Sequence, residues 1–145
     1  QMIQAYQQTA SSQLGVVEVP KEDTDKYGIV NTKVGKDVDL QVHSIVEKPK
    51  PEQASSNLAV VGRYILTPRT FELLEETKRG AGGEIQLTDA ISALLEHETV
   101  FAHRFKGKRY DCGSKLGYLK ATVDFGLKHH ELGDDFRNYL STVVK

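Results

Sequence analysis

The sequence lacks three features that would each point to a different class of protein. It has one cysteine, Cys112, which excludes an internal disulfide and a cysteine-rich metal cluster and fits a reducing compartment. No apolar run approaches the roughly 20 residues of a membrane-spanning helix, and no charged-then-apolar signal opens the chain. Net charge is also small, because 19 basic and 20 acidic residues leave −1. These absences predict a cytoplasmic protein with no nucleic-acid partner and no membrane partner.

The order of hydrophobic patterns favours a mixed α/β sheet over an all-β sandwich, because several strand patterns come first and most helical ones are inserted late. A chain of 145 residues with 39% hydrophobic content can bury a sizeable core. Strands are expected at 14–19, 27–32, 38–47, 58–66 and 99–105. Helices are expected at the N-terminus, after Thr67, at 87–97, from Leu116 and from Asp134.

Local signals add detail to these elements. The nearly continuous apolar run at 58–66 predicts a central strand that is buried on both faces. Thr67 and Pro68 predict an N-cap followed by proline at the first helical position, and Asp134 predicts the cap of the last helix. The polar run at 21–26 predicts a loop, and the glycine at 35 predicts a turn.

The most informative stretch is Glu47-Lys48-Pro49, at the end of the third expected strand. Proline cannot donate to a sheet and disfavours helical backbone before it, so Lys48 is expected to be extended at the sheet rim. Glu47 is then the last paired residue of the strand. A carboxylate there can accept hydrogen bonds from sugar hydroxyls, and the neighbouring ammonium can hold a phosphate. The alternative is a solvated strand end with a charged turn.

Four separated segments together resemble bacterial UTP–glucose-1-phosphate uridylyltransferases, also called UDP-glucose pyrophosphorylases. They are VEKP at 46–49, SNLAVVGRY at 56–64, GEIQLTDAI at 83–91 and KRYDCGSKLGY at 108–118. Related thymidylyl- and adenylyltransferases share the Glu-Lys-Pro element, whereas the last segment points to the uridylyl branch. The resemblance implies an α/β nucleotidyltransferase fold, Rossmann-like with a mixed sheet and C-terminal helices.

The resemblance covers only the later half of that family's chain. The family's glycine-rich Gly-x-Gly-Thr-Arg loop, its upstream lysine and its first metal-binding aspartate have no counterpart here. We therefore expect one C-terminal portion of a nucleotidyltransferase domain, with a sugar-phosphate part at 1–112 and C-terminal helices at 113–145. The implied parent reaction makes UDP-glucose and pyrophosphate from UTP and glucose 1-phosphate, and the isolated chain is expected to be inactive.

The resemblance implies a role for several residues on the sugar side. Glu47 would hold glucose hydroxyls, and Lys48 would hold the phosphate of glucose 1-phosphate as a catalytic group. Gly28 would let the backbone approach the sugar, and the alternative is an ordinary turn glycine. Val60 would offer backbone contacts, although core packing explains a valine equally well. Glu84 would lie near the sugar pocket, or else be a carboxylate that precedes a helix.

The resemblance also implies a magnesium cofactor, with Asp111 as its carboxylate ligand and a catalytic residue. One or two carboxylates plus substrate phosphates are a usual Mg²⁺ environment. The alternative for Asp111 is a turn residue beside Gly113. We expect no metal at His129 and His130, because neighbours on a helix face different ways and no third ligand is suitably spaced.

Two alternatives to the enzyme fragment belong to other classes of protein. The chain can be a non-catalytic sugar-phosphate-binding module, or it can be an oligomerisation domain. In the enzyme reading, separation from the upstream half is expected to leave an unpaired strand edge and apolar surface, and therefore self-association. The resemblance also implies a homo-oligomer, with the helix at 132–144 as the candidate contact.

Overall fold

The computed structural model describes residues 1–33, 39–80 and 83–144, which form two compact units. The first unit is Gln1–Phe105 and the second is Lys106–Lys145. Our division at residue 112 followed the expected roles of the two parts, and it stays a prediction. The predicted turn at 35–37 lies outside the described residues. Within the described part, no helix is both long enough and apolar enough to cross a membrane.

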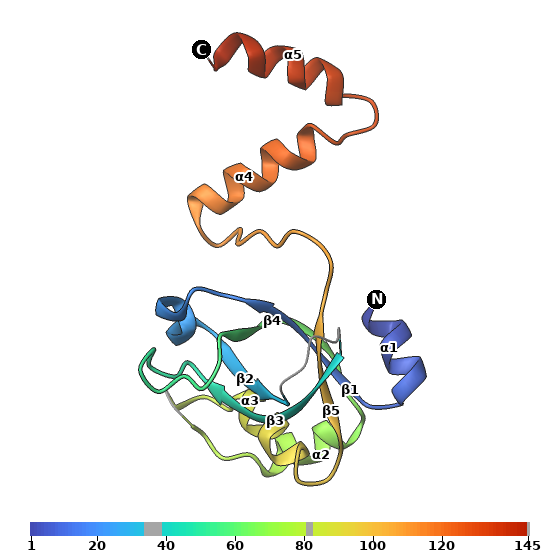
Figure 1. Cartoon of the computed structure of the whole chain (residues 1–145), viewed down its shortest axis with the longest axis vertical. Helices are drawn as coiled ribbons and strands as arrows, with labels where there is room; N and C mark the ends of the chain where they lie inside the picture. The colour runs from blue at the N-terminus through green and yellow to red at the C-terminus, as the bar shows by residue number, and fades with distance from the viewer. Residues whose placement is uncertain (34–38, 81–82, 145) are drawn as a thin grey trace. The chain divides into compact units, whose positions relative to one another are not determined.

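The described residues of the first unit form five strands and four helical segments (Figure 1). In chain order these are α1 (Met2–Thr9), β1 (Ser12–Glu18), the 3₁₀ helix η1 (Lys21–Lys26), β2 (Gly28–Thr32), β3 (Asp39–Glu47), β4 (Leu58–Ile65), α2 (Arg69–Glu76), α3 (Leu87–Leu94) and β5 (Val100–Arg104). All five predicted strands form, each within two residues of its predicted bounds. The segment at 21–26, which we predicted as a loop, is helical, and its first turn carries Glu22 and Asp23, where a helix dipole favours acidic groups.

The five strands form one mixed sheet in the order β1-β4-β2-β3-β5, which closes into a barrel. Closure occurs because β5 pairs in parallel with β1 and antiparallel with β3, while the remaining pairs are antiparallel. The predicted mixed sheet is therefore confirmed. The expected unpaired edge is wrong for the described strands, each of which has two neighbours, because closure joins the two outer strands.

Strand β4 is central, between β1 and β2, but only its first half is buried. Leu58 to Val60 are buried, whereas Gly62 to Tyr64 are exposed, so the prediction of burial on both faces is wrong for the second half. Residues 61–63 of β4 lie opposite the single residue Gly15 of β1, and Gly62 has φ +72°. This bulge turns the later side chains out of the core.

The core joins the inner sheet face to α3, which lies against β3, and to α2, which lies against α3 (Figure 1). One face of α3 enters the core: Ile91 and Leu94 are fully buried, and Leu87 and Leu95 pack against the core from its margin. The helix after Thr67 begins at Arg69, and the predicted cap is wrong. The Thr67 hydroxyl instead donates to the Glu98 carboxylate at 2.7 Å.

Ile91→Ala tests whether this core stabilises the first unit. The side chain has no exposed surface, so its truncation leaves a cavity and should lower the free energy of unfolding by about 2–5 kcal/mol. Urea denaturation followed by circular dichroism measures the loss. The matched change Ile3→Ala, at an exposed position of α1, should cost no more than about 0.5 kcal/mol. Equal losses at the two positions would contradict the assigned core.

As far as residue 144, the second unit consists of the loop from Lys106 and two helices, α4 (Lys115–Gly126) and α5 (Gly133–Val143). Ser114 caps α4, because its hydroxyl oxygen accepts the Gly117 N–H at 3.0 Å. Helix α5 begins one residue before the cap that we predicted, so Asp134 lies in its first turn, where a carboxylate is also favourable. The ring of Phe136 lies so close to Gly126 that an added Cβ there would approach it to 2.7 Å. A side chain at 126 would therefore push the two helices apart.

Candidate functional site

Glu47 ends β3, as predicted, and is its last paired residue, opposite Gly28 of β2. Its side chain is only 22% exposed. An added Cβ on Gly28 would lie 3.2 Å from Glu47 Oε2 and 3.0 Å from Thr88 Cγ2. Gly28 thus makes room for the carboxylate beside the neighbouring strand. The predicted close approach of a sugar to Gly28 stays a prediction.

Lys48 differs from its expected conformation. Its φ is +47°, in the left-handed region, and not extended. The reason is that its N–H donates to the carbonyl of Tyr27, the residue just before β2, at 2.9 Å, and the chain then turns into the buried Pro49. A non-glycine residue in this conformation costs on the order of 1–3 kcal/mol and is a recurrent feature of functional sites.

The turn at Lys48 places its side chain beside that of Glu47. In a continuing strand the two side chains would point to opposite faces. Here Lys48 Nζ lies 3.4 Å from Glu47 Oε1, and the lysine side chain remains 58% exposed. An ion pair of this exposure contributes little to stability. It does present one carboxylate and one ammonium together at the end of a strand.

Two residues that we did not predict lie in the surroundings of Glu47. Thr88, in the first turn of α3, is 6% exposed and contacts the Gly28 position, and its hydroxyl has no hydrogen-bond partner among the described residues. Tyr64 is 36% exposed, and its pKa is raised mainly by this partial burial and additionally by the negative charge of Glu47. We call Gly28, Glu47, Lys48, Tyr64 and Thr88 the Glu47 cluster. Tyr64 and Thr88 lie inside the segments at 56–64 and 83–91 that carry the family resemblance. Membership of these segments was the signal in the sequence that could have identified both residues.

Val60 and Glu84 have no hydrogen bond or ion pair with Glu47 or Lys48 in the part of the chain that the structure describes. Val60 is buried in the core, where β4 pairs it with Val16. Glu84 is exposed shortly before α3, and its carbonyl accepts the Gly80 N–H at 2.9 Å. The sugar contacts expected of both residues stay predictions.

Asp111 belongs to the second unit, in a loop that is tightly closed on itself. Its Oδ1 accepts the Gly113 N–H at 3.1 Å, and its carbonyl accepts the Ser114 hydroxyl at 3.1 Å. An added Cβ on Gly117 would lie 1.9 Å from that carbonyl. The carboxylate is exposed, and Oδ2 has no donor among the described residues. Its expected cooperation with Glu47 and Lys48 stays a prediction.

The Asp111 carboxylate fits Mg²⁺ in its chemistry. It is an accessible hard oxygen ligand held by a turn, and Mg²⁺ usually needs only one or two such groups besides waters and substrate phosphates. Cys112, which lies beside it, is exposed and free. The loop is thus consistent with either reading of Asp111, as a metal ligand or as a turn residue.

Next to this loop, Asp124 of α4 accepts hydrogen bonds from both Lys108 and Tyr110. The pKa of Asp124 is lowered by these two donors, chiefly by Lys108, and the pKa of Lys108 is raised by the same pairing. The Lys108 ammonium also lies 4.9 Å from the centre of the Tyr110 ring. The charge of Lys108 is thus balanced within the second unit.

The pKa of Tyr110 offers a test of this network. It is raised above 10 mainly because the hydroxyl donates to the Asp124 carboxylate, while Lys108 acts in the opposite direction. Asp124→Ala removes the acceptor, so the pKa of Tyr110 should fall, as measured by NMR titration of ring-labelled tyrosine. Asp135→Ala, at an exposed position of α5, serves as the control. An unchanged Tyr110 pKa in Asp124→Ala would contradict the hydrogen bond.

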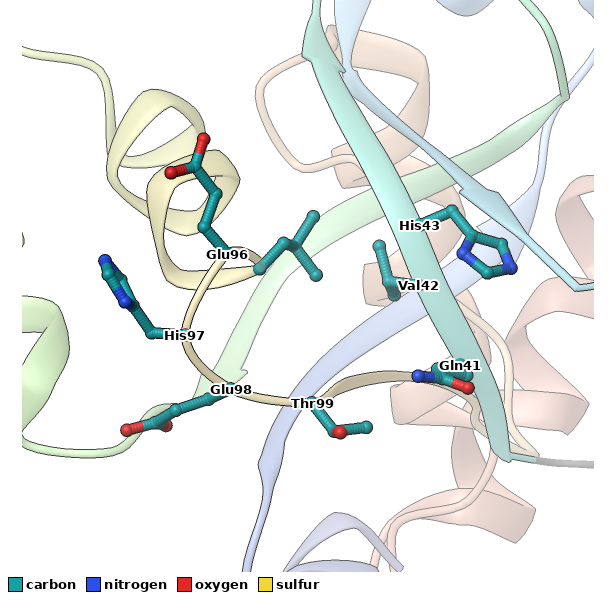
Figure 2. A pocket seen from close by; sticks show the side chains of 8 residues that line it. Gln41, Val42, His43, Glu96, His97, Glu98 and Thr99 are labelled. Atoms are coloured by element: carbon teal, nitrogen blue, oxygen red, sulfur yellow. The ribbon is translucent and has the colours of Figure 1, made fainter.

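A hollow of about 300 Å³ lies elsewhere on the first unit (Figure 2). It is lined by Gln41, Val42, His43, Leu95, Glu96, His97, Glu98 and Thr99. Figure 2 shows Glu96 and His97 pointing away from β3, and His43 lies on the other side of the strand. Glu98 is engaged by Thr67. The polar groups do not converge, and the hollow contains none of the predicted site residues.

Comparisons with known proteins all find nucleotidyl transferases. A family model described as nucleotidyl transferase matches residues 1–126. The chain is 48% identical to a UTP–glucose-1-phosphate uridylyltransferase of Streptococcus pneumoniae, with 100% of this chain and 49% of the relative covered. It is 45% identical to a uridylyltransferase of the same name, numbered 2, from Streptococcus pyogenes, with the same coverage. The chain therefore spans about half the length of the curated relatives it matches.

Solved structures give the same result. A UTP-bound UGPase from Acinetobacter baumannii superposes with a TM-score of 0.85 at 44% identity, and the match covers 99% of this chain and 49% of that one. A UDP-glucose pyrophosphorylase complexed with UDP-glucose superposes with a TM-score of 0.82 at 44% identity, with 88% and 49% covered.

Proposed function

The chain belongs to the nucleotidyl transferase family, as its motifs predicted, and we propose that it is the sugar-phosphate-binding part of a UTP–glucose-1-phosphate uridylyltransferase. The complete enzyme would join glucose 1-phosphate to UTP and release pyrophosphate. The observation that carries this proposal is the Lys48 turn, which sets an ammonium 3.4 Å from the Glu47 carboxylate at the end of β3. Lys48 and Asp111 would act in catalysis, and the sugar side would be bound by Glu47, Lys48, Gly28, Val60 and Glu84.

Each group in the cluster has a distinct part in this proposal. The Glu47 carboxylate accepts hydrogen bonds from sugar hydroxyls, and its low exposure strengthens them. The Lys48 ammonium has three donors, so it can contact Glu47 and still donate to the sugar phosphate. With Lys48 held beside Glu47, its ammonium would orient an oxygen of the sugar phosphate toward the α-phosphorus of UTP. A new O–P bond forms there, and pyrophosphate leaves with the electron pair of the bond that breaks.

Positioning and charge stabilisation suffice for this reaction, and no protein nucleophile is required. Mg²⁺, when bound, supplies positive charge to the phosphate oxygens of both substrates. Asp111 would hold that ion with its exposed carboxylate. The upstream part of the enzyme would bind the nucleotide, and this division explains why the present chain alone should not turn over.

The test compares the isolated chain with the complete protein that contains it. Pyrophosphate release from UTP and glucose 1-phosphate should be undetectable for the isolated chain and readily detected for the complete protein. UDP-glucose should be the sugar product. Turnover by the isolated chain would contradict the proposed division of substrates. Failure of the complete protein to form UDP-glucose would contradict the proposed activity.

We also propose that the parent enzyme is a homo-oligomer that associates through α5. Leu132, Phe136, Tyr139 and Val143 recur at helical spacing on one face, and all but Phe136 are exposed. Exposed apolar surface of this kind favours a protein partner, and a second copy of the chain is the simplest one.

Introducing charge on this face tests the contact. Tyr139→Asp combined with Val143→Asp should weaken self-association by roughly tenfold or more, because each charge must be desolvated in the interface. Sedimentation equilibrium over a range of concentrations measures the change. Asn138→Asp, on a neighbouring exposed position, adds the same kind of charge off the stripe and should have little effect. A monomeric wild-type chain at high concentration would contradict the proposal.

A further inference from the structure

The connection between α4 and α5 brings together residues that we expected to lie apart. We placed His129 and His130 on a helix, where neighbouring side chains diverge, but α4 ends at Gly126. Beyond it, the N–H groups of Lys128 and His129 donate to the carbonyls of Phe125 and Gly126, each at 3.2 Å. The connection is therefore a tight turn, and the helical argument against a shared ligand does not apply.

His129, His130 and Glu131 each offer one ligand atom, and these three atoms lie within 4.8 Å of one another. The two imidazole rings meet edge to face, with their centres 4.9 Å apart. All three side chains are exposed. Within the described part of the chain, one hydrogen bond involves these ligand atoms, and it runs from the Glu131 N–H to His129 Nδ1 at 3.3 Å. A bond of that length is weak and easily replaced.

Two imidazoles and a carboxylate form a ligand set that suits a divalent transition-metal ion such as Zn²⁺. Tetrahedral bonds of about 2.0–2.1 Å place neighbouring ligand atoms roughly 3.3 Å apart. The present spacing of up to 4.8 Å has to shorten by at most about 1.5 Å, and exposed side chains can rotate to allow it. A fourth position remains for water.

We propose that His129, His130 and Glu131 bind a divalent transition-metal ion and that the bound ion holds the α4–α5 turn closed. The turn already has an internal tie, because the Gly133 N–H donates to the His129 carbonyl at 2.9 Å. Glu131 lies two residues before the start of α5, so a bound ion links the end of the turn to its beginning. The metal preference of this site differs from that of Asp111, because Asp111 offers only oxygen ligands whereas this site offers two imidazole nitrogens.

Zinc titration of the tag-free chain by calorimetry tests the proposal. A Cys112→Ser background removes the exposed thiol as a competing ligand. One Zn²⁺ should bind per chain, and His129→Ala or His130→Ala should weaken binding by on the order of tenfold or more. His97→Ala removes an exposed histidine of the first unit and should leave the affinity unchanged. Mg²⁺ at the same concentration should leave the Zn²⁺ affinity unchanged, because two imidazoles do not suit Mg²⁺.

A second measurement reports the turn itself. Hydrogen exchange at the Gly133 amide should slow several-fold with Zn²⁺ and should not respond in His129→Ala, because bound metal suppresses local opening. Equal zinc affinity in the His129→Ala and His97→Ala proteins would overturn the proposal. So would an absence of binding at millimolar zinc, or exchange at Gly133 that does not respond to a bound ion.

Discussion

Replacing Lys48 with glycine in the complete enzyme should lower kcat/KM for glucose 1-phosphate by roughly 10²–10³-fold without destabilising the fold, because a preorganised charge on a reacting phosphate is lost. The backbone explains the second half of this expectation. An L-residue at φ +47° carries a penalty of about 1–2 kcal/mol that glycine avoids. Glycine gives back about 0.5–1 kcal/mol through the larger entropy of the unfolded chain. The free energy of unfolding should thus stay unchanged or rise slightly.

The companion variant Lys48→Ala separates charge from conformation. Alanine keeps the left-handed penalty and removes the ammonium, so its kcat/KM should fall as far as that of Lys48→Gly. Lys50→Ala removes another exposed lysine just after Pro49 and should change kcat/KM little. Steady-state kinetics and urea denaturation give the two quantities. A glycine variant with near wild-type kcat/KM would show that Lys48 is kept for its turn and not for its charge.

The strands could be predicted because each carries a local signal, namely an apolar run that ends at glycine, proline or charged residues. Glu47 was predicted as the last paired residue because Pro49, two residues later, cannot extend a ladder. Barrel closure could not be predicted in the same way. It depends on β5 pairing with both β1 and β3, and residues so distant in sequence leave no periodic mark of their partners.

The Lys48 turn escaped prediction for a related reason. The preference of a pre-proline residue for extended backbone is a local tendency. The hydrogen bond from the Lys48 N–H to the Tyr27 carbonyl is a tertiary contact, and it outweighs that tendency. The consequence is functional, since the turn is what brings Nζ beside Glu47.

The side chains that join the Glu47 cluster from other elements could be identified only once the fold was known. Thr88 belongs to α3 and Tyr64 to the outward-turned end of β4. The bulge at Gly62 turns this end of β4 outward, and the glycine inside the strand pattern was the signal that could have predicted it. At His129 the error had the opposite effect. We predicted a helix that continues through His129 and His130, and we therefore dismissed a group of potential metal ligands that the turn after Gly126 brings together.

A double-mutant cycle between Lys48 and Asp111 should show strong coupling in the complete enzyme. Each single change to alanine is expected to lower kcat/KM by roughly 10²-fold or more, because each removes a group proposed to act on the reacting phosphates. If both act on the same transition state, the double variant should be less impaired than the sum of the two losses. The expected coupling is about 1–3 kcal/mol, whereas independent sites add to within about 0.5 kcal/mol.

Lys48→Ala with Asp134→Ala is the matched control, since Asp134 is an exposed carboxylate of the same second unit. Its single change should be nearly silent, and the pair should be additive. The cycle is informative because Lys48 and Asp111 belong to different units, so coupling in kcat/KM would require both units to serve one transition state. Additive losses for Lys48 and Asp111 would instead mean that they act on separate steps, and Asp111 would then be better explained by its turn with Gly113 and Ser114 than by a bound metal.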